Sequence, residues 1–141
     1  MNDDLSRFVA AQAPHVATVM AELRAGRKRT HWMWFVFPQL RGLGRSEMAR
    51  RFGLESLAEA SAYLAHPILG ERLRACVAAL LAVQGRSAHE IFGSPDDLKL
   101  RSCLTLFLAV DGPDGVFARA LEKYFDAQPD PMTLQLLADA R

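Results

Sequence analysis

The stretch SPDDLKLRSCLTLFLAV (residues 94–110) decides the fold class, because it combines a clear helix start with a long apolar body. Ser94 is a typical N-cap residue, Pro95 is a typical first helical residue, and two acidic residues follow in the first turn. We therefore expect Ser94 to cap a helix that begins at Pro95 and runs to about Val110. Apolar residues fill so many of its positions that this helix is expected to lie in the core.

Helical spacing of apolar residues recurs on both sides of this stretch. The expected helices cover residues 5–12, 14–25, 47–52, 57–66, 67–84, 116–126 and 131 onward, with a short helical turn at 88–92. Ser56 and Ser87 each have a glutamate three residues later, which predicts a capping box at both positions. Only WFVF (34–37) is a candidate strand, and it has no convincing partner. The sequence therefore predicts an all-α protein, a compact single-domain multihelical bundle of about 7–8 helices over residues 1–141.

Composition narrows the class of protein. The chain has 141 residues, of which 50% are hydrophobic and 23% are charged, as in a globular domain. No apolar run reaches the roughly 18–20 residues that cross a bilayer, and the start lacks the apolar stretch of a signal peptide. We expect a cytoplasmic protein without membrane contact. Cys76 and Cys103 are expected to be buried free thiols, and no histidine or cysteine pair has metal spacing, so no metal or cofactor is predicted.

Charge is distributed unevenly along the chain, although the net charge is only +1. Residues 1–51 hold nine Lys and Arg against four Asp and Glu, whereas residues 52–141 hold eight against twelve. This asymmetry favours an anionic partner for the first third of the chain. It is too weak to predict nucleic-acid binding, which usually needs a much more basic domain.

The stretch RAGRKRTHWMWFVFPQLRGLGRSEM (24–48) concentrates unusual chemistry. Four basic residues precede His31, four aromatic residues follow within six positions, and a glycine-punctuated turn comes next. One interpretation is an apolar plug, because large aromatic side chains dominate cores. The other is a surface that stacks a ring and binds phosphate through arginines. The plug does not explain His31 and Gln39, which stand at the two ends of the aromatic run.

Two further segments carry candidate binding residues. Arg45 and Ser46 follow a flexible turn and precede a helix start, where free backbone N–H groups favour an anion. The alternative there is a plain loop with a serine cap. Asp96, Lys99 and Ser102 are three residues apart on a very apolar helix and form a polar line. The alternative for this line is an intrahelical ion pair with hydroxyls bonded to the backbone.

The chain resembles an uncharacterised bacterial family, a domain of unknown function whose members often carry the label "calpastatin-like". The likeness covers nearly the whole chain and is sharpest in KRTHWMWFVFPQLRGLGRSEMA (28–49), YLAHPILGERL (63–73) and IFGSPDDLKLRSCLTLF (91–107). The resemblance implies an all-helical single domain in which these three segments recur together. It implies no established reaction and no catalytic residues, and nothing in the chain resembles a disordered protease inhibitor.

These observations predict one shared site, in which residues 31–46 touch residues 94–105. Its acid–base candidates are His31, Asp97 and Lys99. Its ligand-binding candidates are Trp34, Gln39, Arg45, Ser46, His66, Asp96 and Ser102. The expected ligand is a small anionic metabolite, with a nucleotide or an ADP-ribose-like molecule as the candidates. The sequence leaves open whether the site is catalytic.

Two alternatives belong to other functional classes. The aromatic run can instead serve a protein–protein interaction module or a self-associating domain, such as a homodimer, without catalysis. Burial distinguishes these readings, because a flat exposed patch favours an interface and tryptophans covered by polar groups from 94–105 favour a pocket. Weak RNA or DNA binding through residues 24–29 is the third and least favoured hypothesis, and a salt titration tests it.

Overall fold

The computed structural model describes residues 5–140, and within that range it is α-helical and contains no strand. The helices are α1 (Ser6–Gln12), α2 (Val16–Ala25), α3 (Met33–Val36), α4 (Glu47–Phe52), α5 (Leu57–Ala65), α6 (Leu69–Ala82), α7 (Ala88–Phe92), α8 (Asp96–Asp111), α9 (Val116–Phe125) and α10 (Pro131–Asp139), with a 3-10 turn η1 (Ala13–His15) between α1 and α2. The all-α prediction is confirmed. The helical segments that were not expected are two short ones, α3 and η1, whereas α7 matches the predicted turn at 88–92.

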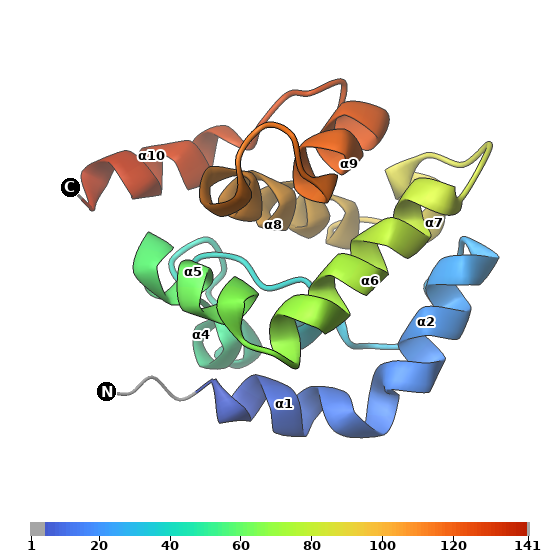
Figure 1. The fold of residues 1–141 in the computed structure, drawn as a ribbon, viewed down its shortest axis with the longest axis horizontal. Coiled ribbons are helices and arrows are strands. Elements are labelled where there is room, and N and C mark those ends of the chain that lie inside the picture. The colour runs from blue at the N-terminus through green and yellow to red at the C-terminus, as the bar shows by residue number, and fades with distance from the viewer. Residues whose placement is uncertain (1–4, 141) are drawn as a thin grey trace.

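Helix α8 lies among four others and forms the centre of the fold (Figure 1). It packs against α5, α7, α9 and α10, while α6 packs against α2, α5 and α9. The middle of α8, from residue 102 to residue 107, is buried at every position. This burial agrees with the expectation that the helix within residues 94–110 lies in the core.

Serine caps form at three of the four helix starts where a serine was the candidate cap. Ser46 and Ser56 each accept a hydrogen bond from the backbone N–H three residues later, and Ser87 forms the complete capping box with Glu90. The box predicted at Ser56 is only half formed. The Glu59 carboxylate accepts from the backbone N–H of Glu55 at 2.8 Å and not from that of Ser56, as a complete box requires.

The predicted Ser94 cap is wrong. Helix α8 begins at Asp96 after Pro95, and no side chain caps it. The backbone N–H of Asp97, which a Ser94 cap would bind, already has a backbone acceptor. Asp97 N donates to Gly93 O at 2.9 Å, and Leu98 N donates to the Asp97 carboxylate at 2.9 Å. Ser94 is exposed.

The aromatic run forms part of the core, and WFVF is not a strand. Met33–Val36 is the short helix α3, and the side chains of Trp32, Phe35 and Phe37 are buried. The Trp32 ring lies 6.1 Å from the Phe37 ring and 6.4 Å from that of Phe92, measured between centroids. The plug interpretation therefore holds for most of the aromatic residues.

A buried carboxylate fixes the basic run that precedes the aromatics. After α2 ends at Gly26, Glu22 accepts hydrogen bonds from the backbone N–H groups of Arg29 and Thr30, from the Thr30 hydroxyl and from the Trp32 indole. The indole bond is 2.9 Å long. These bonds turn the chain back along α2 and set Trp32 into the core.

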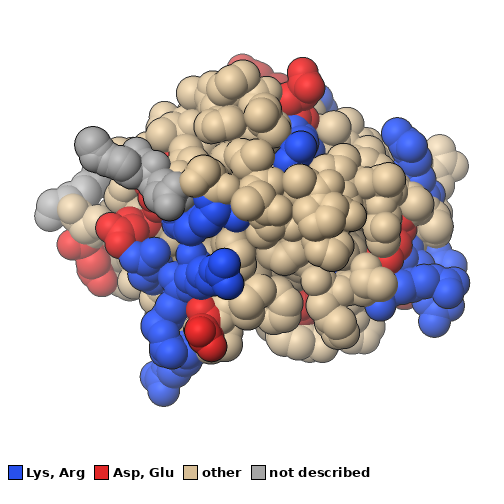
Figure 2. All heavy atoms as spheres, turned by 90° about the horizontal axis from the view of Figure 1, so that it is seen from below, with Lys and Arg blue, Asp and Glu red and all other residues tan. Residues whose placement is uncertain are grey.

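Basic side chains gather mainly at two opposite sides of the face seen in Figure 2, and most of the area between them is uncharged. That face therefore lacks the continuous basic stripe that favours a nucleic-acid backbone. In the described part of the chain, no helix is both long and apolar enough to cross a membrane. Cys76 and Cys103 are buried free thiols, as expected.

Candidate functional site

The two motif segments meet at Trp34 and Lys99. The Lys99 ammonium nitrogen lies 4.9 Å from the centre of the Trp34 ring, so α3 and the first turn of α8 are in contact. This confirms the prediction that residues 31–46 touch residues 94–105. Trp32 is fully buried and Trp34 is half-buried, so the tryptophans do not form a flat exposed patch.

Asp96 is shared unequally between two lysines. Its carboxylate lies 2.9 Å from the Lys28 ammonium and 3.6 Å from the Lys99 ammonium. Only 7% of the Lys28 side chain is exposed, against 24% for Lys99. A buried ammonium needs a close counter-charge, so Asp96 chiefly neutralises Lys28. Lys99 keeps a long contact with Asp96 and a cation–π contact with Trp34, which leaves its donors available to an added anion.

A small hollow opens beside this lysine, and we name it the Trp34–Lys99 hollow. Its lining residues are Met33, Trp34, Phe37, Gln39, Met48, Ala49, Phe52, Gly53 and Lys99. Its volume is about 10 Å³, which is close to the space of one water molecule. Within the described residues, the Gln39 side-chain amide makes no hydrogen bond. The hollow thus combines apolar walls with two polar ends, the Lys99 ammonium and the Gln39 amide.

Asp97 does not line this hollow. One carboxylate oxygen accepts from Leu98 N, and the other lies 3.3 Å from Nδ1 of His89. His89 was not among the predicted site residues, although it stands in the predicted helical turn before α8. His31 is exposed, and it makes no hydrogen bond or ion pair with any part of residues 5–140.

The remaining predicted residues have structural partners or lie outside the hollow. Ser46 caps α4, and His66 Nδ1 accepts from the backbone N–H groups of Ile68 and Leu69 at the start of α6, at 3.1 Å and 3.2 Å. Ser102 donates to Leu98 O and to the Asp130 carboxylate, both at 3.2 Å, and so faces α10. The Arg45 side chain is exposed. Of the predicted set, the structure brings Trp34, Gln39, Asp96 and Lys99 together.

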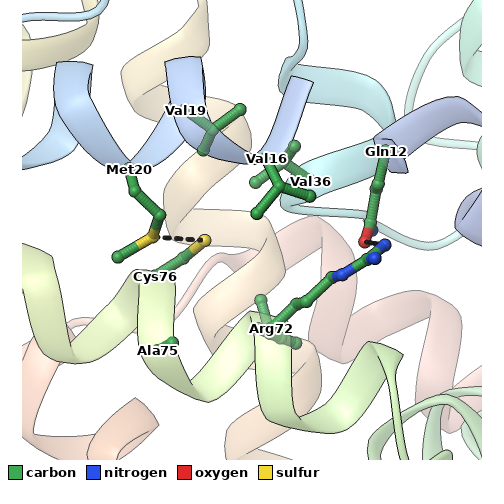
Figure 3. Close-up of a pocket in the computed structure, with 9 residues that line it drawn as sticks. Gln12, Val16, Val19, Met20, Val36, Arg72, Ala75 and Cys76 are labelled. Atoms are coloured by element: carbon green, nitrogen blue, oxygen red, sulfur yellow. Dashed lines mark hydrogen bonds between the residues drawn. The ribbon is translucent and has the colours of Figure 1, made fainter. Parts of the chain in front are cut away.

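A larger cavity lies between α2 and α6 and was not expected from the sequence (Figure 3). It has a volume of about 110 Å³ and carries two polar side chains, Gln12 and Arg72. One signal was visible in advance, because Gln12 is a polar residue on the apolar stripe of the first helix. Arg72 gave no such signal, since it flanks the apolar stripe of α6 like any surface residue.

The described residues contain no candidate metal site, because no three His, Cys, Asp or Glu residues among them are grouped closely enough to hold an ion. Burial raises the pKa of the Cys76 thiol to about 12, so this thiol is protonated and uncharged at neutral pH. The polar chemistry available is therefore that of lysine, arginine and amide donors.

Comparisons with known proteins identify relatives without an assigned activity. A family model described as "Protein of unknown function (DUF1810)" matches residues 2–137. The crystal structure of the conserved hypothetical protein Rv1873 from Mycobacterium tuberculosis has a TM-score of 0.94 against this fold. The two chains are 57% identical, and the match covers 96% of each. No functionally curated protein matches the chain.

Proposed function

Starting from a chain that belongs to the DUF1810 family of proteins of unknown function, we propose that it binds a small anionic molecule at the Trp34–Lys99 hollow. One observation carries the proposal. Lys99 has only a long, 3.6 Å contact with Asp96, because that carboxylate is bound more closely by the buried Lys28. An anion that reaches Lys99 therefore meets an ammonium group that has no close counter-ion.

The apolar walls of the hollow favour a bound organic ligand over a simple surface ion pair at Lys99. Ligand sites are mainly apolar and hold a few placed polar groups. Here Met33, Phe37 and Phe52 form apolar walls, while Gln39 and Lys99 supply donors. A single ligand oxygen fits a space of about 10 Å³, so the rest of the molecule lies on the surface beside Trp34.

The proposed role is binding rather than acid–base catalysis. A catalytic acid or base has to lie within hydrogen-bond reach of the reacting atoms. Asp97 has partners in Leu98 N and His89, and His31 does not line the hollow. The ligand class is therefore an anionic oxygen group, a phosphate or carboxylate, on a small organic molecule. A nucleotide or ADP-ribose-like metabolite remains one candidate within that class.

A thermal-shift screen identifies the ligand. The panel contains inorganic phosphate, nucleotides, sugar phosphates and carboxylic acids. A ligand at about 100 times its dissociation constant stabilises the folded protein by about 2.7 kcal/mol, which gives a clear shift in the melting temperature.

Lys99→Met then tests the site with the best ligand. We expect at least a tenfold loss of affinity, because a charged hydrogen bond contributes about 1.5 kcal/mol or more. Arg119→Gln is the control, since it also removes a positive charge from an exposed side chain, on α9. Equal affinity in Lys99→Met and in the control would exclude the Trp34–Lys99 hollow as the anion site.

A further inference from the structure

The cavity between α2 and α6 is separate from the Trp34–Lys99 hollow and has no role in the proposed function. Its apolar walls come from both helices and from α3, and they are Val16, Val19, Met20, Val36, Leu73, Ala75 and Cys76. Figure 3 shows the Met20 and Cys76 sulfur atoms at one side and Gln12 and Arg72 at the other. The cavity is partly open to solvent, so a molecule can enter without unfolding a helix.

Arg72 is a half-buried cation with almost no partner. Within residues 5–140 its guanidinium makes one hydrogen bond, to the Gln12 side-chain oxygen at 3.3 Å, and no ion pair. A guanidinium has five N–H donors in a fixed planar arrangement, so most of its capacity is unused here. A carboxylate satisfies two of these donors at once.

Gln12 cannot satisfy Arg72 any better, because its own position is fixed. Its amide nitrogen donates to Phe35 O at 2.6 Å and to the Tyr63 hydroxyl at 3.0 Å. Its side chain is buried, so these bonds hold the amide in one orientation. Gln12 therefore forms a fixed polar edge of the cavity, while the charge of Arg72 stays available.

We propose that this cavity binds a short-chain aliphatic carboxylate. The carboxylate pairs with Arg72, and the hydrocarbon chain lies between α2 and α6 among Val19, Met20 and Cys76. Nothing else in the lining carries charge, which matches one monovalent head group and an apolar body. The inference does not depend on the Trp34–Lys99 hollow, because the two sites share no lining residue.

The volume sets the length of the chain. An apolar cavity of about 150 Å³ binds benzene, which has six carbons, so about 110 Å³ accepts about four. Pentanoate has that number of carbons beyond its carboxylate. Each buried methylene tightens binding by about fourfold. The affinity should therefore rise about fourfold per carbon from acetate to pentanoate and level off for longer acids.

Methyl NMR of methionine-labelled protein locates the binding directly. Met20 lies in the cavity, Met33 and Met48 line the Trp34–Lys99 hollow, and Met132 is 59% exposed on α10. Titration with pentanoate should shift the Met20 signal and leave Met132 unchanged. Pentanamide has the same shape without the charge, and it should bind at least tenfold more weakly. An unmoved Met20 signal, or equal binding of acid and amide, would overturn the proposal.

Two variants test separately the contribution of the carboxylate head group and that of the cavity. Arg72→Gln should remove the preference for acid over amide while the chain-length dependence remains. Ala75→Leu fills the cavity from its exposed edge and should weaken pentanoate binding at least tenfold, so the test does not depend on whether Arg72→Gln folds. Ala78→Leu is the matched control, because Ala78 is exposed on the same helix and outside the lining. Arg119→Gln removes a positive charge outside both sites and should bind pentanoate like the wild type. Unaltered binding in Ala75→Leu would exclude this cavity as the site.

Discussion

At the scale of single residues, two carboxylates hold the basic segment in place next to the tryptophans. Glu22 holds the segment after α2 through the backbone of Arg29 and the indole of Trp32. Asp96 holds the same segment from the other side through the Lys28 ammonium. Lys28 is therefore structural, because Asp96 on α8 neutralises it, whereas Glu22 on α2 binds only backbone and uncharged side-chain groups of this segment. Lys99, which has only the longer contact with Asp96, is available to a ligand.

Glu22→Gln should destabilise the protein by about 2 kcal/mol at pH 7, because a charged acceptor of four hydrogen bonds becomes neutral. Burial acts to raise the pKa of the Glu22 carboxyl, but the bonds from Arg29, Trp32 and Thr30 outweigh it and lower the pKa below the ordinary 4.5. A lowered pKa means that the stabilisation is complete above pH 4.5 and is lost as the pH falls through the folded-state value.

Urea unfolding of wild type and Glu22→Gln between pH 3 and pH 7 checks this prediction. The difference in the free energy of unfolding should be largest at neutral pH and shrink in acid. A difference that stays constant over this range would show that the charge of Glu22 contributes nothing.

Asp96 and Asp97 are adjacent, but they should respond very differently to the same substitution. Asp96→Asn leaves the buried Lys28 ammonium without its close counter-charge, and we expect a loss of about 2 kcal/mol or more. Asp97→Asn keeps an acceptor for Leu98 N, so we expect a change of about 0.5 kcal/mol or less. Chemical denaturation at pH 7 measures both, and an equal loss would contradict the assignment of Asp96 to Lys28.

At the scale of helices, the cap serines give a paired prediction. Ser46→Ala removes the oxygen that accepts from Ala49 N and should cost about 1 kcal/mol. Ser94→Ala should leave the denaturation midpoint unchanged, because Ser94 makes no cap and is exposed. Thermal or urea unfolding compares the two. A larger loss in Ser94→Ala than in Ser46→Ala would contradict the observed start of α8.

Local signals predicted most helices because they act over a few residues. The end of α2 is marked by Gly26, and the starts of α4 and α7 are marked by Ser46 and Ser87. Each of these residues makes its capping hydrogen bond to a residue at most four positions away. The start of α8 was predicted wrongly because the backbone carbonyl of Gly93, and not the Ser94 hydroxyl, accepts from Asp97 N. Local signals did not predict the helix α3 either, because a four-residue apolar run has the same pattern in a strand and in a buried helix.

At the scale of the whole molecule, the sequence predicted which segments meet and not which side chains pair. Trp34 and Lys99 come together as expected, whereas His66 and Ser102 serve helix starts and helix packing. The pairing of Arg72 with Gln12 joins residues 60 positions apart in the chain. No local spacing encodes such a contact, because it depends on how α1, α2 and α6 pack around one cavity.

An anion bound beside Lys99 would lie next to two methionines, so methionine methyl NMR can detect it at that place. Titration of wild type and Lys99→Met with the strongest anion from the thermal-shift screen gives two sets of shifts. We predict that the signals of Met33 and Met48, which line the hollow, move in wild type and stay fixed in Lys99→Met, while exposed Met132 moves in neither. Binding that leaves Met33 and Met48 unmoved in wild type, or moves them equally in Lys99→Met, would contradict the account.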